Sequence, residues 1–141
     1  MTSEEVKRKF ESMLDIDLLI DSKLAEKREL KRRLTDIKSP SFGDRVQTTK
    51  DPDKFSEVFS KIIELEKEVD SDIDKSLELK KECRNLIETL KNNLHKAVLH
   101  KIYFEGKTLK LVSMECGKSI RQIANIRNDS FVQIAENSKL H

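Results

Sequence analysis

The chain has 141 residues, of which 38% are charged and only 5% aromatic, with three glycines and no tryptophan. This length fits one domain, or one small domain joined to an elongated module, and the composition favours long solvated helices over a thick core or a sheet. The formal net charge of +2 hides an asymmetry, because residues 1–91 hold 20 Lys/Arg against 22 Asp/Glu, whereas residues 92–141 hold 8 against 4.

Several classes of protein are disfavoured at this point. The two cysteines have no CxxC spacing and no clustered histidines around them, so neither a zinc site nor a disulfide framework is indicated. No apolar run approaches the ~18–20 residues of a transmembrane helix, and the first residues, MTSEEVKRKF, lack the pattern of a signal peptide. We therefore expect a soluble cytoplasmic protein without a cofactor.

The first 91 residues are predicted to form two long helices. One covers about residues 3–37, where Thr2 and Glu5 can form a capping box, and the other covers about residues 52–91. Apolar side chains recur in both at steps of three and four, as in an amphipathic helix. In the first helix they are Val6, Phe10, Met13, Leu14, Ile20, Leu24, Leu30 and Leu34, and in the second Phe55, Phe59, Ile62, Leu65, Val69, Ile73, Leu77, Cys83, Leu86 and Leu90.

A loop over residues 38–52 separates these helices, with Pro40, Gly43 and Pro52 as breakers and Asp51 as a predicted N-cap. Two helices of similar length joined by one loop predict a long antiparallel, coiled-coil-like hairpin as the first domain, residues 1–91. A lone two-helix hairpin hides each apolar stripe only partly. We therefore expect a homodimer formed through the hairpin.

Charge tests this pairing in part. If residue i of the first helix lies near residue 90 − i of the second, the basic run at 23–33 faces Glu57, Glu64 and Glu66. The same register brings six carboxylates close together: Asp15, Asp17, Asp21, Asp70, Asp72 and Asp74. These are either a solvated face or an acidic patch for a partner, and both interpretations stay open.

Residues 92–141 are predicted to form a second domain of three short helices, at about 93–105, 108–115 and 119–136. Gly117 can adopt the left-handed conformation that ends one helix and redirects the chain, and Ser113 is small enough for a close crossing. Ser119 and Gln122 can form a capping box for the last helix. With Val112, Cys116, Ile123 and Ile126 facing inward, this spacing is typical of a helix-turn-helix. The predicted fold class is all-α.

The outward face of the last helix then presents residues suited to the major groove of DNA. Arginine pairs with guanine, and glutamine or asparagine with adenine. The candidates for base contacts are Arg121, Gln122, Asn125 and Asn128, with Arg127 beside them, and the candidates for phosphate contacts are Lys107, Lys110 and Lys118. Gln122 could instead only cap its helix, Arg127 could pair with an acidic neighbour, and the lysines could be merely solvated. Arg121 and Asn125 have no capping role and are the best candidates.

The stretch YFEGKTLKLVSMECGKSIRQI resembles region 4 of bacterial sigma factors, whose helix-turn-helix reads the −35 promoter element. The whole chain is similar to a phage protein family of Gram-positive hosts, related to the RinA/ArpU-type late-gene regulators, that joins a long helical hairpin to such an end. The family's Ser-x-Arg-Gln-[Val/Ile] recognition motif corresponds to Ser119, Arg121, Gln122 and Ile123. The sequence departs from sigma region 4 at Ser113, Lys118, Ile120 and Ala124.

This resemblance implies a phage-borne or prophage-borne transcription regulator that binds double-stranded DNA. The alternative is a protein-interaction adaptor whose hairpin binds RNA polymerase, a host factor or a phage repressor. We do not expect an enzyme or a metal site, because the sequence has no nucleophile elbow, phosphate-cradling glycine loop or metal-ligand cluster.

Overall fold

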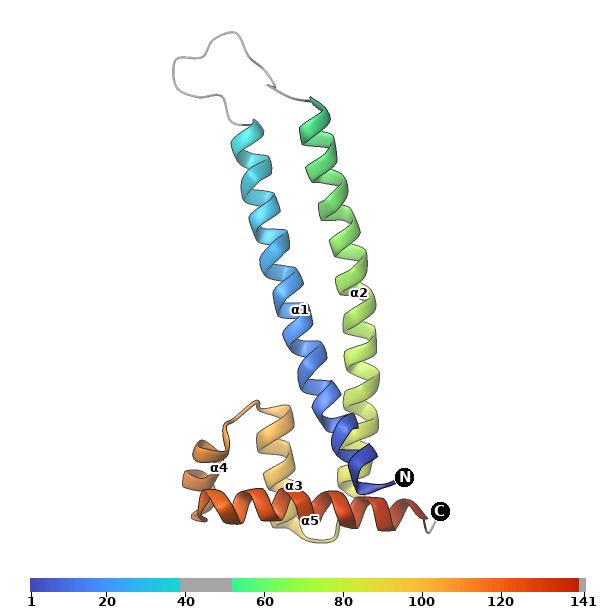
Figure 1. Ribbon diagram of the computed structural model, residues 1–141, viewed down its shortest axis with the longest axis vertical. Helices are drawn as coiled ribbons and strands as arrows, with labels where there is room; N and C mark the ends of the chain where they lie inside the picture. The colour runs from blue at the N-terminus through green and yellow to red at the C-terminus, as the bar shows by residue number, and fades with distance from the viewer. Residues whose placement is uncertain (39–51, 140–141) are drawn as a thin grey trace. The chain divides into compact units, whose positions relative to one another are not determined.

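The computed structural model describes residues 1–38 and 52–139, and in that part the chain is all-helical, as predicted. Figure 1 shows the elements: α1 (Ser3–Lys38), α2 (Pro52–Glu88), α3 (Asn93–Leu99), the π-helical turn η1 (His100–Phe104), α4 (Leu109–Cys116) and α5 (Ile120–Lys139). The predicted loop residues Pro40 and Gly43 and the predicted N-cap Asp51 lie outside the described residues. No helix in the described ranges is both long enough and apolar enough to cross a membrane.

The helices divide into two compact units, which we describe separately. We call Asp17–Lys75 the arm, and Met1–Ile16 with Ser76–His141 the C-terminal unit. Both long helices pass through both units, so the C-terminal unit contains the beginning of α1 and the end of α2 as well as the short helices.

In the arm, α1 and α2 run antiparallel and hold each other by a narrow apolar seam and by ion pairs. The seam consists of Ile20, Leu30, Ile62, Leu65 and Val69. The Nζ atom of Lys23 lies 2.6 Å from the Asp72 carboxylate, and that of Lys27 lies 3.1 Å from the Glu66 carboxylate. The residue numbers of these two pairs add up to 95 and 93. The register expected from charge gives a sum of 90, so the observed register differs from it by only a few positions.

The C-terminal unit is built around one apolar core that draws on every helix in it. The ring of Phe10 packs edge-on against Tyr103 at 5.2 Å between centroids and lies 5.4 Å from Phe131. Around these rings lie fully or nearly fully buried side chains: Val6, Met13, Cys83, Ile87, Leu90, Val98, Leu99, Ile102, Val112, Ile123, Ile134 and Ala135. The core therefore combines residues of the predicted first domain, 1–91, with residues of the predicted second domain, 92–141.

The helix expected at 93–105 is present but changes its winding. Asn92 caps α3 by accepting the Leu94 N–H at 2.8 Å. From His100 the backbone winds as a π-helix, and the Glu105 N–H donates to the His100 carbonyl at 3.0 Å. The wider turn brings Ile102 and Tyr103 into the core, and Gly106, with φ 67°, ends the segment before α4.

Replacing Phe10 by alanine is expected to lower the free energy of unfolding of the C-terminal unit by about 3–5 kcal/mol, because it removes a fully buried ring from the centre of the core. The single tyrosine of the chain, Tyr103, reports on this unit, so tyrosine fluorescence during urea denaturation measures the effect. Leu19→Ala, at a position 46% exposed in the arm, is the control and should shift this transition by less than about 1 kcal/mol. Equal effects of the two substitutions would contradict the assignment of the core.

Candidate nucleic-acid interface

A tight turn joins α4 to α5. Gly117 has φ 66° and ψ 32°, the left-handed conformation expected from the sequence, and the Lys118 N–H donates to the Ser113 carbonyl at 3.1 Å. The Ser113 hydroxyl donates to the Lys118 carbonyl, so this small side chain closes the turn as well as leaving room for it. A Cβ added at Gly117 would meet no atom within 4 Å, so the requirement for glycine there is conformational rather than steric.

The start of α5 is fixed by the predicted capping box. The Ser119 N–H donates to Gln122 Oε1 at 2.9 Å, and the Gln122 N–H donates to Ser119 Oγ at 3.1 Å. Behind the turn, Val112 of α4 and Ile123 of α5 are fully buried, and Cys116 and Ile126 pack against the same core. Both capping side chains are therefore occupied within the protein.

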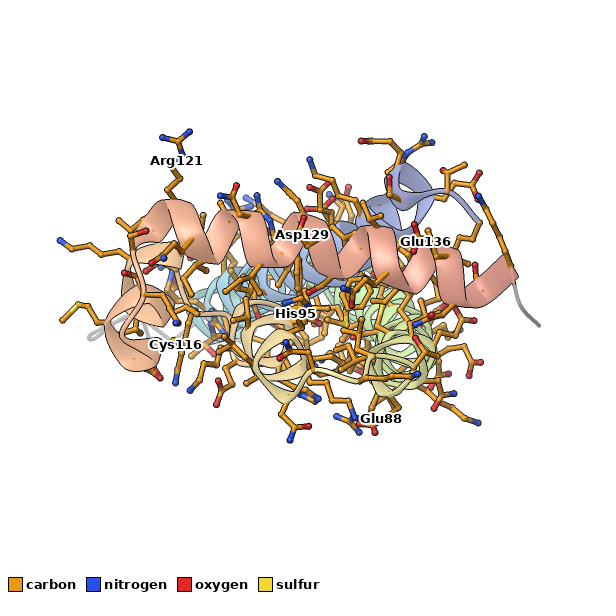
Figure 2. The ribbon with its side chains drawn as sticks, turned by 90° about the horizontal axis from the view of Figure 1, so that it is seen from below. Glu88, His95, Cys116, Arg121, Asp129 and Glu136 are labelled. Atoms are coloured by element: carbon orange, nitrogen blue, oxygen red, sulfur yellow. The ribbon has the colours of Figure 1, made fainter. Side chains whose placement is uncertain are left out.

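The outward face of the first half of α5 is polar and exposed. Arg121, Asn125 and Asn128 are all exposed, and Figure 2 shows Arg121 extending away from the other helices of its unit. The side chains of Arg121 and Asn125 make no hydrogen bond or ion pair with any other described residue. Ile120, at the first turn, is 48% exposed and adds an apolar group beside this face.

Arg127 lies differently from the position expected beside this face. Its side chain is half-buried, and its Nε is enclosed without a partner among the described residues. Burial raises the pKa of Tyr103 to about 12, while the charge of Arg127 acts in the opposite direction, which shows that the guanidinium lies near the phenol. Arg127 thus faces the protein rather than the solvent.

The three candidate lysines are not equivalent. Lys107 Nζ lies 2.6 Å from one Glu115 oxygen and 2.8 Å from the other, and Lys101 reaches the same carboxylate at 3.0 Å. Hydrogen bonding between Lys107 and Glu115 raises the pKa of Lys107 and lowers that of Glu115, so both are charged and satisfied. Lys110 and Lys118 are exposed, and neither forms an ion pair with a described residue.

The sign of the exposed charge changes along α5. Arg121 lies near the beginning of the helix, whereas the exposed Asp129 lies at its middle and the exposed Glu136 near its end, as Figure 2 shows. A phosphate backbone would be attracted to the first half and repelled by the second. The part of the predicted recognition helix suited to DNA is therefore about residues 118–128.

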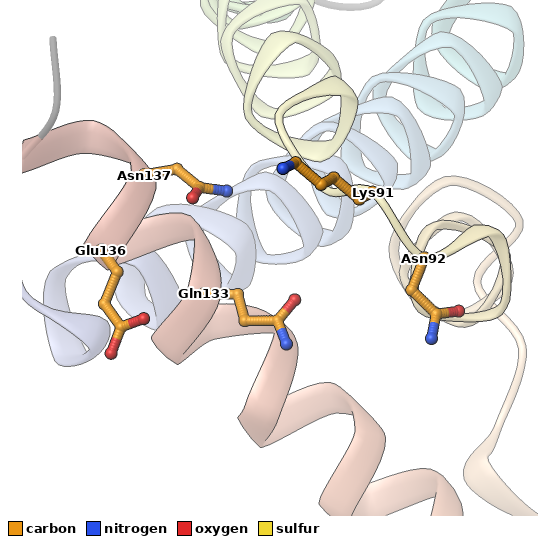
Figure 3. Close-up of a pocket in the computed structure, with 5 residues that line it drawn as sticks. All are labelled: Lys91, Asn92, Gln133, Glu136 and Asn137. Atoms are coloured by element: carbon orange, nitrogen blue, oxygen red, sulfur yellow. The ribbon is translucent and has the colours of Figure 1, made fainter.

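Near the end of α5 is an open polar pocket of about 390 Å³, lined by Lys91, Asn92, Gln133, Glu136 and Asn137 (Figure 3). Two of its amides have structural roles, because Asn92 caps α3 and the Asn137 Nδ2 donates to the Thr89 carbonyl at 3.0 Å. One lysine and one glutamate leave the lining without net charge, so this pocket does not favour a phosphate.

The six aspartates expected to lie together are placed in different surroundings. Asp72 is only 7% exposed and holds Lys23, whereas Asp21, Asp70 and Asp74 are exposed in the arm. Asp17 is half-buried and interacts with another group, and Asp15 is exposed in the C-terminal unit. Asp72 in particular is buried between the two helices beside the seam and is not part of a free surface.

Two exposed apolar side chains near the turn were not singled out from the sequence. Leu111 is 42% exposed and Met114 is 72% exposed, both on the outer side of α4. The signal was present, since both lie out of phase with the inward positions Val112 and Cys116. Such side chains can add apolar contact area to whatever binds beside α5.

No protein-family model, curated protein or solved structure matches this chain.

Replacing Gly117 by alanine should lower the free energy of unfolding of the C-terminal unit by about 1–2 kcal/mol, because a Cβ disfavours the left-handed conformation. Gly117→Asn should cost less, since asparagine tolerates this region better than alanine does. Urea denaturation followed by Tyr103 fluorescence compares the two variants. An alanine variant as stable as the original chain would show that the turn does not need positive φ.

Proposed function

We propose that this protein is a sequence-specific DNA-binding transcription regulator of phage or prophage type, in which α4 and α5 form a helix-turn-helix. The observation that carries the proposal is the geometry around Gly117. A short left-handed turn leads into a capped helix whose first exposed residues, Arg121 and Asn125, have no partner among the described residues. The first half of α5 would lie in the major groove.

The chemistry of the exposed face suits base edges. A guanidinium can donate two hydrogen bonds to guanine, and a carboxamide can donate and accept with adenine. Arg121 and Asn125 are four residues apart and so lie on one side of α5. Ile120, which is exposed at the first turn, offers an apolar contact for a thymine methyl group beside this face. Asn128 extends the polar face by a further turn.

Phosphate contacts would come from Lys110 and Lys118, which are exposed and unpaired within the described residues. Lys107 is a weaker candidate, because a phosphate would have to displace the Glu115 carboxylate. Ser119 and Gln122 act first as caps, so their expected contribution is to hold the helix end in place, with Ser119 close to the backbone of the DNA. Arg127 would position the helix through its contact with the Tyr103 side of the core.

The charge balance indicates modest affinity for a single copy. Residues 92–141 carry 8 basic and 4 acidic side chains, and part of the basic charge is already neutralised by Glu115. Binding that depends on few phosphate contacts is weak and falls with salt concentration. Two copies on a doubled site would supply the rest of the affinity.

The second candidate is a protein-interaction adaptor whose helical arm binds RNA polymerase, a host factor or a phage repressor. It is favoured by the exposed apolar side chains of the arm, such as Leu18 and Phe59, and by its exposed acidic residues Asp21, Asp70 and Asp74. This function predicts binding that survives changes on α5. A role without catalysis, in the cytoplasm of a bacterial host, is part of both proposals.

The test is to select duplexes from a random double-stranded pool with the full chain, and then to titrate the enriched duplex by fluorescence anisotropy at two salt concentrations. Arg121→Ala combined with Asn125→Ala should weaken binding at least tenfold, because each bidentate contact contributes ~1–3 kcal/mol. Arg8→Ala combined with Asn93→Ala removes the same groups from exposed positions elsewhere in the C-terminal unit and should change affinity less than twofold.

Either of two results would contradict the DNA-binding proposal. One is a pool without any enriched sequence at either salt concentration. The other is equal weakening by the two double variants, which would show that only overall charge matters and that α5 does not read bases.

A further inference from the structure

We propose that the arm binds a second copy of this chain through one flank of its two helices. We call this the apolar flank, and define it by Leu18 on α1 and Phe59, Ile63 and Ile73 on α2. These side chains are 64%, 48%, 37% and 40% exposed, respectively. The inference concerns the arm alone, and so it stands or falls independently of DNA binding by α5.

The opposite flank of the arm is polar along α2, and an ion-paired lysine, Lys23, bridges the two helices there. Lys23 Nζ lies 2.6 Å from Asp72 and 3.8 Å from Glu68 across the two helices. Along α2, the exposed residues of this flank are all hydrophilic: Lys61, Glu64, Glu68, Ser71 and Lys75. The two sides of α2 therefore differ in character, whereas α1 carries an exposed apolar side chain on the ion-paired flank as well, Leu19, four residues before Lys23.

Helical geometry places the exposed apolar residues together on the other side. Leu18 precedes Lys23 by five residues, and Ile73 follows Glu68 by five residues. Five residues turn a helix by about 140°, so both side chains lie away from the ion-paired flank. Because the helices are antiparallel, the two also lie at the same level along the arm. Phe59 and Ile63 lie on the same side of α2 as Ile73, in steps of four and three, with two charged residues between them: Glu66, which pairs with Lys27, and Asp70.

The arm cannot cover this flank by itself. Its buried apolar seam is one side chain wide on each helix, and two helices can shield each other only along the line where they touch. Single exposed apolar side chains are normal on a protein surface. Four large ones gathered on one flank of a two-helix arm, opposite a wholly polar flank of α2, indicate a surface that binds a protein.

The charges of the arm identify a second copy as the occupant. Between residues 23 and 33, α1 carries six basic and two acidic side chains, whereas α2 carries six acidic and one basic between residues 64 and 74. Within one chain these are matched only in part, through pairs such as Lys27 with Glu66. Arg28 and Lys31 on α1 and Asp70 and Asp74 on α2 remain exposed. A second copy that presents its α2 to this α1 supplies the opposite charge.

The same arrangement also covers the exposed apolar side chains. With α1 of each copy against α2 of the other, Leu18 meets Ile73 of the second copy, and Ile73 meets Leu18 of the second copy. This is the self-complementary contact required by a two-fold axis. Because Leu18 and Ile73 lie at the same level, the axis runs along the arm and the two arms point in the same direction, which gives a four-helix bundle.

The experiment measures the mass of the purified full chain by light scattering after size exclusion, over a hundredfold range of concentration. The original chain should show twice the monomer mass. Ile63→Glu and Leu18→Glu should raise the dimer dissociation constant at least tenfold, because each places a carboxylate in the apolar contact. Far-ultraviolet circular dichroism should be unchanged, since both positions are exposed in the single copy.

Ser71→Glu is the matched control, because it adds the same charge at an exposed position on the polar flank of α2, and it should leave the dimer intact. A monomer at every concentration would overturn the proposal and assign the flank to a different protein. A dimer that resists both substitutions, or that is weakened equally by Ser71→Glu, would also overturn it.

Discussion

The C-terminal unit depends on the contact of Phe10 with Tyr103 and Phe131. These three rings come from α1, the π-helical turn and α5, and each is almost completely buried. By fixing which side of α5 faces the core, they also fix which side faces outward. Ile123, Phe131 and Ile134 point inward, and helical spacing then turns Arg121 and Asn125 to solvent. The orientation of the candidate interface is thus a consequence of core packing. The capped turn before α5 fixes where the helix begins.

The same constraint limits where a ligand of α5 could bind. The first half of the helix has an exposed arginine and two exposed asparagines, with exposed lysines at the turn and at the start of α4. Exposed carboxylates follow at Asp129, in the middle of the helix, and at Glu136, near its end. A polyanion would meet favourable charge only over the first half. The proposed interface is therefore short, which fits a module that gains affinity by being present twice.

Much of this arrangement could be predicted from the sequence, because local signals decide it. The helices follow from apolar periodicity, and the turn follows from Gly117 with Ser119 and Gln122, whose hydrogen bonds are those the spacing indicated. The sequence could not predict features that depend on tertiary neighbours. The π-helical turn is set by how Ile102 and Tyr103 fit the core. Lys107 is ion-paired with Glu115, eight residues away, and the side chain of Arg127 lies near Tyr103, which is distant in sequence. Likewise, nothing local distinguishes Asp72, which is buried with Lys23, from the exposed Asp70 and Asp74.

The central claim, that the first half of α5 contacts DNA, is tested most directly by nuclear magnetic resonance. The backbone amides of the ¹⁵N-labelled chain would be followed as an enriched duplex is added. The account predicts that the largest shifts fall on residues 118–128 and near Lys110, while residues 129–139 change little. Shifts confined to the arm or to the second half of α5 would contradict it, as would a spectrum that does not change when the duplex is in excess.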